Sequence, residues 1–144
     1  MSDLIFYANG TGQTAARTDV KVRNFNLIVD EPEDLGGSDL NANPVEYILA
    51  GFAGCVNVVA NLTAKELGIK VKNLKINVSG TLNPNKLFGT DNSERAGYKK
   101  IQLSISADVN ANKELKSKWL KTIEERCPVS DNLKNPTEVV LSLN

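Results

Sequence analysis

Apolar side chains are most concentrated in the middle of the chain, between Asn43 and Gly68. The stretch opens with a helix-start pattern: Asn43 can cap, Pro44 suits the first helical position, and Glu46 can reach back to the Asn43 amide. It closes at Gly68, a residue type that tolerates the left-handed conformation of a helix end. We predict one helix of about 24 residues, roughly 36 Å long.

The centre of this helix, residues 48–59, has no charged residue, and apolar or small side chains cover nearly every angle. This pattern is typical of a helix that is buried on all sides. Gly51 and Gly54 lower helix propensity, so we expect another group to approach the backbone closely there. Asn57 and Asn61 interrupt the apolar run, which we expect to be too short for a membrane span.

Alternating apolar and polar residues predict strands on the N-terminal side of the helix. Residues 4–8 are expected to form a short strand, followed by a hairpin turn at residues 9–10. Residues 17–29 alternate with a phase slip at residues 23–24, which indicates two strands or one bent strand. The acidic residues 30–34 are typical of a solvated loop.

The same alternation returns after the helix in residues 69–82, with a phase slip at Asn73, and in residues 98–109. These two segments suit an antiparallel pair joined by the polar loop 83–96. Residues 139–143 are expected to form a closing strand.

A second helix is predicted over residues 111–126, because apolar residues recur there at helical spacing. Pro128 ends this helix near Cys127 and can begin a new short helix with Cys127 as its N-cap. There the helix dipole and free amides would favour a thiolate, and Arg126 adds positive charge. Together the elements predict one α+β domain over residues 1–144, with the long helix packed on sheet.

Composition excludes several kinds of function. Lys+Arg and Asp+Glu each number 17, so the net charge of zero argues against non-specific nucleic-acid binding. The absence of histidine removes Ser-His-Asp and Cys-His catalysis, and two cysteines alone cannot complete a zinc site. The N-terminus has neither a basic leader nor a long apolar run, so we expect a cytoplasmic protein with reduced thiols or a redox pair.

The two cysteines, Cys55 and Cys127, allow two interpretations. Each can be a small buried hydrophobic residue, since cysteine is often fully buried. Alternatively, they form a thiol pair in which one sulfur attacks a substrate and the other resolves the product. They lie 72 positions apart (127 − 55), so only the fold can bring them together.

The segments NPVEYILAGFAGC and CPVSDNL, together with the DEPEDLGG loop before the helix, resemble the OsmC/Ohr family of osmotically inducible and organic hydroperoxide resistance proteins. The resemblance implies an α+β OsmC-like fold, with antiparallel sheets packed on a long buried central helix. It also implies an intertwined homodimer with its sites at the subunit interface.

The resemblance further implies a cysteine-based peroxidase that reduces organic hydroperoxides. Cys55 would attack the peroxide oxygen and become a sulfenic acid, and Cys127 would condense with it to a disulfide. A small dithiol of the lipoyl type, or another small dithiol, would restore both thiols. The family resemblance implies no metal and no organic cofactor.

A buried Cys55 needs a neighbouring cation to become a thiolate, because burial raises a thiol's pKa and the N-terminal dipole lies three turns away. Peroxidases of the family use an arginine from the N-terminal half, for which Arg23 is the first candidate and Arg17 the second. They orient it with an acid directly after the helix-opening proline. This sequence has Val45 there and Glu46 one position later, so Glu46 is either an active-site acid or a helix cap.

Two other functions remain open from the sequence. The missing acid at position 45 also suits a non-enzymatic redox sensor, or a small-molecule-binding protein on the same scaffold. An interaction scaffold with two inert core cysteines is the third possibility.

Overall fold

The structure, a computed structural model, describes residues 2–143. The chain divides into two compact units, residues 1–48 and residues 49–144. The expectation of a single domain over the whole chain stays a prediction.

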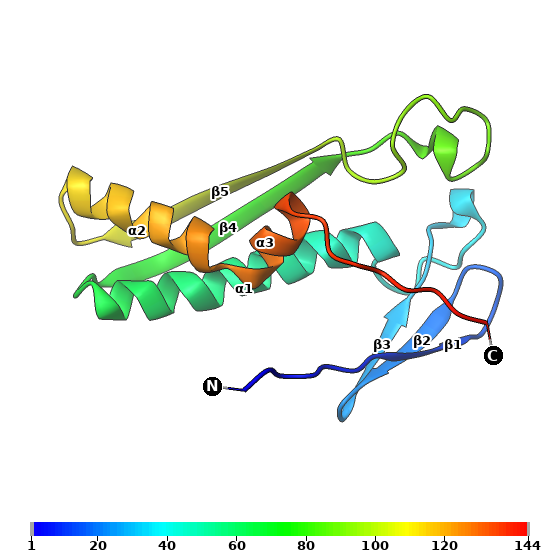
Figure 1. Ribbon diagram of the computed structural model, residues 1–144, viewed down its shortest axis with the longest axis horizontal. Helices are drawn as coiled ribbons and strands as arrows, with labels where there is room; N and C mark the ends of the chain where they lie inside the picture. The colour runs from blue at the N-terminus through cyan, green and yellow to red at the C-terminus, as the bar shows by residue number, and fades with distance from the viewer. Residues whose placement is uncertain (1, 144) are drawn as a thin grey trace. The chain divides into compact units, whose positions relative to one another are not determined.

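The first unit contains a three-stranded antiparallel sheet in the order β1-β2-β3 (Figure 1). The strands are β1 (Asn9–Gly12), β2 (Thr18–Val22) and β3 (Phe25–Val29). Val22 pairs with Phe25, so residues 23–24 form the turn of a tight hairpin. The phase slip at this point of the sequence therefore marks a turn between two strands, as predicted.

The expected strand over residues 4–8 and the expected turn at residues 9–10 are both wrong. Residues 9–10 lie inside β1, where they pair with Lys21 and Val20 of β2. The chain reverses at residues 13–17 instead, where the Gln13 amide donates to the Arg17 carbonyl over 2.9 Å. An Asn-Gly pair in a strand is unusual, and here the turn lies a few residues further along the chain.

The acidic loop after β3 is organised by one carboxylate rather than being merely solvated. Asp30 is 1% exposed, and its two oxygens accept the amides of Glu31, Ser38 and Leu40 over 2.9 to 3.2 Å. Burial would raise the pKa of Asp30, but these three amides and the charge of Arg17 together lower it.

The long helix α1 (Pro44–Glu66) has 23 residues, close to the predicted length. Its start is a capping box: the Glu46 amide donates to Asn43 Oδ1 and the Asn43 amide donates to a Glu46 carboxylate oxygen, each over 2.9 Å. Gly68 follows the helix with a φ of 68°, in the left-handed region. Both predicted ends of the helix are confirmed.

The burial of α1 differs from the expectation of all-round cover. Its buried residues are few and lie on one side: Val56, Val59, Ala60, Thr63 and Ala64. Val58 is 64% exposed and Leu62 is 47% exposed. Apart from the adjacent backbone of the helix itself, no described atom lies within 4 Å of a Cβ placed on Gly51 or Gly54, so the close approach expected at these glycines is not seen.

The length and composition of α1 would also suit a membrane span, contrary to the expectation that its apolar run is too short. Such a helix is weak evidence for a membrane, because the core helix of a globular protein passes the same test. From Leu49 onward its buried residues pack against the other elements of the second unit.

The second unit places a two-stranded antiparallel hairpin and two further helices along α1 (Figure 1). These elements are β4 (Val71–Thr81), β5 (Lys100–Val109), α2 (Lys113–Arg126) and α3 (Pro128–Lys134). The predicted slip at Asn73 is a bulge, since Asn73 has a φ of 52° and the register of β4 against β5 shifts between Lys72 and Lys75. The expected strand at residues 139–143 is wrong, because the structure has no strand there.

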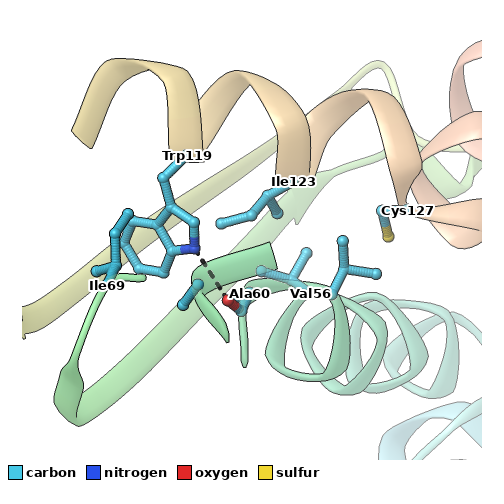
Figure 2. Packing of buried hydrophobic residues seen from close by; sticks show 8 residues of the cluster. Val56, Ala60, Ile69, Trp119, Ile123 and Cys127 are labelled. Atoms are coloured by element: carbon cyan, nitrogen blue, oxygen red, sulfur yellow. Dashed lines mark hydrogen bonds between the residues drawn. The ribbon is translucent and has the colours of Figure 1, made fainter. Parts of the chain in front are cut away.

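The core of the second unit forms where α2 packs on α1 (Figure 2). Trp119, Ile123 and Cys127 recur every four residues and therefore share one face of α2 and its end. This face meets Val56 and Ala60 of α1, and the Trp119 indole N–H donates to the Ala60 carbonyl over 2.9 Å. The hydrogen bond fixes the position of α2 along α1, and with it the position of Cys127.

Candidate active site

The fold brings the two cysteines into direct contact. Cys55 lies in the third turn of α1, and Cys127 lies between α2 and α3. Their Sγ atoms are 2.8 Å apart and both cysteines are free thiols. This separation exceeds a disulfide bond of about 2.05 Å by only about 0.8 Å, so a small movement suffices to join the sulfurs.

The beginning of α3 supplies amide donors to both sulfurs. Cys127 is the N-cap of α3, as predicted, and its Sγ accepts the amide of Ser130 over 3.4 Å. The Val129 backbone amide acts on Cys55, since it lowers the pKa of that thiol. Pro128 at the first helical position carries no N–H of its own, and the two amides that follow it point toward the thiol pair.

Burial raises the pKa of Cys55, and the neighbouring Cys127 raises it further, while the Val129 amide lowers it in part. The effect of Cys127 has a simple cause, since two thiolates at this distance repel each other and one proton is retained between them. No positive side chain is among these influences, which involve only residues of the second unit.

The two thiols differ in exposure. Cys127 is 1% exposed, whereas Cys55 is partly exposed. Cys55 therefore offers more surface to a reagent from solvent, and Cys127 packs in the apolar core.

A groove of about 580 Å³ adjoins Cys127. Its walls come from α1, β5, α2, α3 and the segment 95–99 before β5, all within the second unit. Small-molecule sites in proteins usually span about 300 to 1,000 Å³, so the groove is large enough for an organic ligand.

The remaining predicted site residues lie in the first unit. Arg23 occupies the β2–β3 turn with a φ of 54°, and its guanidinium lies 5.1 Å from the centre of the Phe25 ring. Arg17 forms a two-pronged ion pair with Asp19 over 2.9 and 3.1 Å. The activating role of either arginine toward Cys55 stays a prediction.

Glu46 makes the capping box of α1, which accounts for its position in the sequence. Nine residues along a helix place Glu46 about half a turn around the axis from Cys55. Its role as an active-site acid also stays a prediction.

The sequence predicted free amides at the start of the short helix after Cys127, but not that those of Val129 and Ser130 act on the two thiols, and it did not predict the contribution of Trp119. The two amides belong to the backbone, so no side-chain pattern marks them. Trp119 is one of the apolar residues at helical spacing in the predicted second helix, and its hydrogen bond to the Ala60 carbonyl depends on tertiary packing. Among residues 2–143, no group of three or more His, Cys, Asp or Glu side chains is placed to hold a metal.

Comparison with protein families matches residues 36–142 to the OsmC family, described as OsmC-like protein. The chain belongs to this family. The match includes α1 and both cysteines and begins just after the acidic residues 30–34. No curated protein matches the sequence.

Solved structures of OsmC-like proteins share the fold over nearly the whole chain. An OsmC-like protein from Mycoplasma pneumoniae aligns with a TM-score of 0.79 and 19% identity, covering 92% of this chain and 89% of that one. An organic hydroperoxide resistance protein from Elizabethkingia anophelis aligns at 0.67 and 21%, covering 92% and 90%. Another from Legionella pneumophila aligns at 0.65 and 19%, covering 93% and 92%. The fold is therefore the α+β OsmC-like fold, with antiparallel sheets and a long central helix, as predicted.

Proposed function

We propose that this OsmC-like protein is a thiol-dependent peroxidase that reduces organic hydroperoxides, with Cys55 as the peroxidatic and Cys127 as the resolving cysteine. The observation that carries the proposal is the contact of 2.8 Å between two free thiols whose sequence positions are far apart. It is supported by the likeness of the chain to proteins named for organic hydroperoxide resistance.

In the reacting form Cys55 is a thiolate, and the Val129 amide favours this charged form. The Cys55 thiolate attacks the peroxide oxygen farther from carbon. The O–O bond breaks, its electron pair leaves with the alkoxide, and the alkoxide takes a proton from water to become an alcohol. Cys55 is left as a sulfenic acid.

Cys127 then attacks the Cys55 sulfur, a disulfide forms, and the sulfenic hydroxyl leaves as water with the Cys127 proton. The short sulfur–sulfur distance supports this step because neither helix has to move far. An external dithiol, such as a lipoyl-type compound, reduces the disulfide and becomes a disulfide itself. We assign the activation of Cys55 to Arg23; Glu46 serves as its partner acid only if Glu46→Gln slows turnover, and otherwise is a helix cap.

The exposed side of α1 supports a homodimer. Val58 and Leu62 lie on this side with the open backbone of Gly54, and together they offer an apolar, closely approachable surface. A second copy of α1 packed there would give the glycines the close contact that one chain lacks. We place this dimer in the cytoplasm.

A thiol count tests the catalytic proposal. The reduced protein is mixed with one equivalent of an alkyl hydroperoxide, and we expect loss of both thiols and one internal disulfide. Cys127→Ser should instead accumulate a sulfenic acid on Cys55 that a dione reagent traps, whereas Cys55→Ser should keep its remaining thiol. If the wild-type protein loses neither thiol, or never forms the internal disulfide, the proposal fails.

A non-enzymatic redox sensor is the second candidate, and the raised pKa of Cys55 favours it, because a protonated thiol reacts slowly. Continuous assay with a dithiol separates the two candidates. An enzyme consumes many equivalents of hydroperoxide per chain, whereas a sensor is oxidised once and stops.

A further inference from the structure

The thiol pair offers two sulfur ligands and no third. Cys55 and Cys127 are the only cysteines in the sequence, both are free thiols, and their Sγ atoms lie 2.8 Å apart. In the described range 2–143, no His, Asp or Glu side chain completes a group of three with them. The pair is therefore unsuited to a metal ion that needs three or four protein ligands, but it suits an atom that needs two sulfurs only.

The packing of α2 on α1 holds the two sulfurs in place before any ligand arrives. The Trp119 indole N–H donates to the Ala60 carbonyl over 2.9 Å. At the end of α1, both carboxylate oxygens of Glu66 accept hydrogen bonds from the Arg126 guanidinium, next to Cys127. When one sulfur of such a pair has bonded a ligand, the other is already within reach, so the second bond costs little further entropy. A ligand that bonds both sulfurs is favoured over one that bonds a single sulfur.

The distance between the sulfurs favours a bent bridge over a linear one. Two bonds of roughly 2.3 Å, the length of a zinc–thiolate bond, place the sulfurs roughly 3.4 Å apart when they meet near a right angle, and roughly 4.6 Å apart when they are collinear. Starting from 2.8 Å, the bent bridge needs an opening of about 0.6 Å and the linear bridge one of about 1.8 Å. Because Cys127 is buried in a close-packed core, the smaller movement is preferred.

We propose that Cys55 and Cys127 chelate monosubstituted trivalent arsenicals, R–As(OH)₂, as a cyclic dithioarsonite. Trivalent arsenic is a soft, pyramidal centre with bond angles near a right angle, whereas two-coordinate Cu(I) and Hg(II) are linear. In the reaction two As–O bonds break and two As–S bonds form. The two thiol protons leave with the hydroxyls as two molecules of water, and arsenic stays trivalent. The carbon substituent is the third bond of arsenic, so no third sulfur is required.

This condensation consumes thiols rather than thiolates and releases no net proton. Burial and the neighbouring thiol raise the pKa of Cys55, which slows its reaction as a nucleophile but leaves the chelate equally stable. Cys55 is also partly exposed, so the pair is not sealed from solvent. The inference uses the thiols of the proposed peroxidase but not their reaction with peroxide, and it makes this class of arsenical an inhibitor of that activity.

Two arsenicals of similar size test the chelate without any peroxide. Methylarsonous acid has two exchangeable hydroxyls and can bond both sulfurs, whereas dimethylarsinous acid has one and can bond a single sulfur. Their affinities for the reduced protein are compared without oxygen by native mass spectrometry, in a fixed excess of 2-mercaptoethanol. We expect methylarsonous acid to bind about a hundredfold more tightly, with one arsenic per chain and both thiols consumed. Equal affinities, or a complex that keeps one thiol free, would overturn the proposal.

Substitution of either sulfur should remove the preference, because Cys55→Ser and Cys127→Ser each leave one thiol. Val59→Ala is the matched control, since it changes a buried side chain of the same core and keeps both thiols. It should retain the preference. A preference that survived in Cys127→Ser, or that was lost equally in Val59→Ala, would contradict chelation by the two sulfurs.

X-ray absorption at the arsenic edge gives a measurement that needs no variant. We expect two sulfur neighbours and one carbon in the complex of the wild-type protein, and one sulfur with one oxygen would refute the chelate. The outcome is separate from that of the thiol count with hydroperoxide. Chelation without peroxide-driven disulfide formation would sink the peroxidase and leave the arsenical site standing, and disulfide formation without chelation would do the reverse.

Discussion

At the scale of single residues, Cys55 and Cys127 are chemically alike but differently placed. Cys127 lies in the core at the N-cap of α3, while Cys55 is partly open to solvent. Burial and the adjacent thiol raise the pKa of Cys55, so it remains protonated to a higher pH than a free cysteine. The rate of its reaction with an alkylating reagent should therefore rise only at a higher pH than the rate for a free cysteine.

Cys127→Ala should shift this titration to lower pH. The substitution removes the neighbouring thiol, which is the second-largest influence raising the pKa of Cys55. We expect the rate of Cys55 alkylation near pH 7.5 to rise several-fold, as measured by mass spectrometry of the labelled peptide. Cys127→Ser retains a hydroxyl and should shift the titration less. An unchanged midpoint in Cys127→Ala would mean that Cys127 does not raise the pKa of Cys55.

Asp30 gives a second residue-scale prediction, this one about acid. The pKa of Asp30 is lower in the folded chain than in the unfolded chain. Its charged form therefore stabilises the loop fully at any pH above the pKa of the unfolded chain. This contribution is lost as the pH falls through the lower pKa of the folded chain. Asp30→Asn should therefore speed hydrogen exchange of the Ser38 and Leu40 amides, after correction for intrinsic rates, at neutral pH. The difference from wild type should shrink in strong acid.

The matched control is Asp34→Asn, because Asp34 is exposed in the same loop. It should leave the exchange of both amides unchanged at every pH. If Asp30→Asn behaved in the same way, the buried carboxylate would not organise the loop.

At the scale of elements, the sequence predicts best where the signal is local. The capping box of α1 and the phase slips at residues 23–24 and at Asn73 each follow from a few adjacent residues; the capping box is confirmed, and the slips correspond to a turn and to a bulge. The failures at residues 4–8 and 139–143 are of another kind. A short alternation of apolar and polar residues indicates that a strand could form. Pairing also requires the free edge of a neighbouring strand, which the sequence does not reveal.

Glu46 allows a test at the same scale, because its two possible roles respond differently to Gln. Gln can also make the capping box. If Glu46 is only a helix cap, the free energy of unfolding of Glu46→Gln should lie within about 0.5 kcal/mol of the wild-type value, and its peroxidase rate should be unchanged. Glu46→Ala should lose about 0.5 to 1 kcal/mol. Urea unfolding and steady-state turnover measure the two effects.

A catalytic acid predicts the opposite pattern. Glu46→Gln would then be stable yet at least tenfold slower with hydroperoxide, since the amide cannot hold an arginine by its charge. The capping box alone already explains the position of Glu46. We therefore expect Glu46→Gln to be active, and a slow, stable Glu46→Gln would assign it to the active site.

At the scale of the whole molecule, the site depends on distant contacts. The resemblance of two short segments to the OsmC/Ohr family predicted the fold class and singled out the cysteine pair, while the contact between their sulfurs comes from the packing of α2 on α1. The groove could not be predicted from the sequence, because its lining comes from five separate segments. Periodicity reports which face of a helix is apolar, but not which other elements meet it.

The exposed side of α1 gives the last prediction. A helix that leaves Val58 64% exposed and Leu62 47% exposed is poorly covered by its own chain, and apolar surface of this kind usually marks an interface. We expect light scattering after gel filtration to give twice the mass of one chain. Val58→Lys should shift the protein toward the monomer, because a charge in a buried interface has no partner there.

Leu120→Lys is the control, since Leu120 is also an exposed apolar residue but lies on α2. It should remain a dimer. If Val58→Lys also stayed dimeric, the copies would meet through another surface, and the open backbone at Gly54 would need a different explanation. If the wild-type protein were a monomer, Cys55 would have to find its activating cation within one chain, which makes the mass measurement a direct constraint on the catalytic proposal.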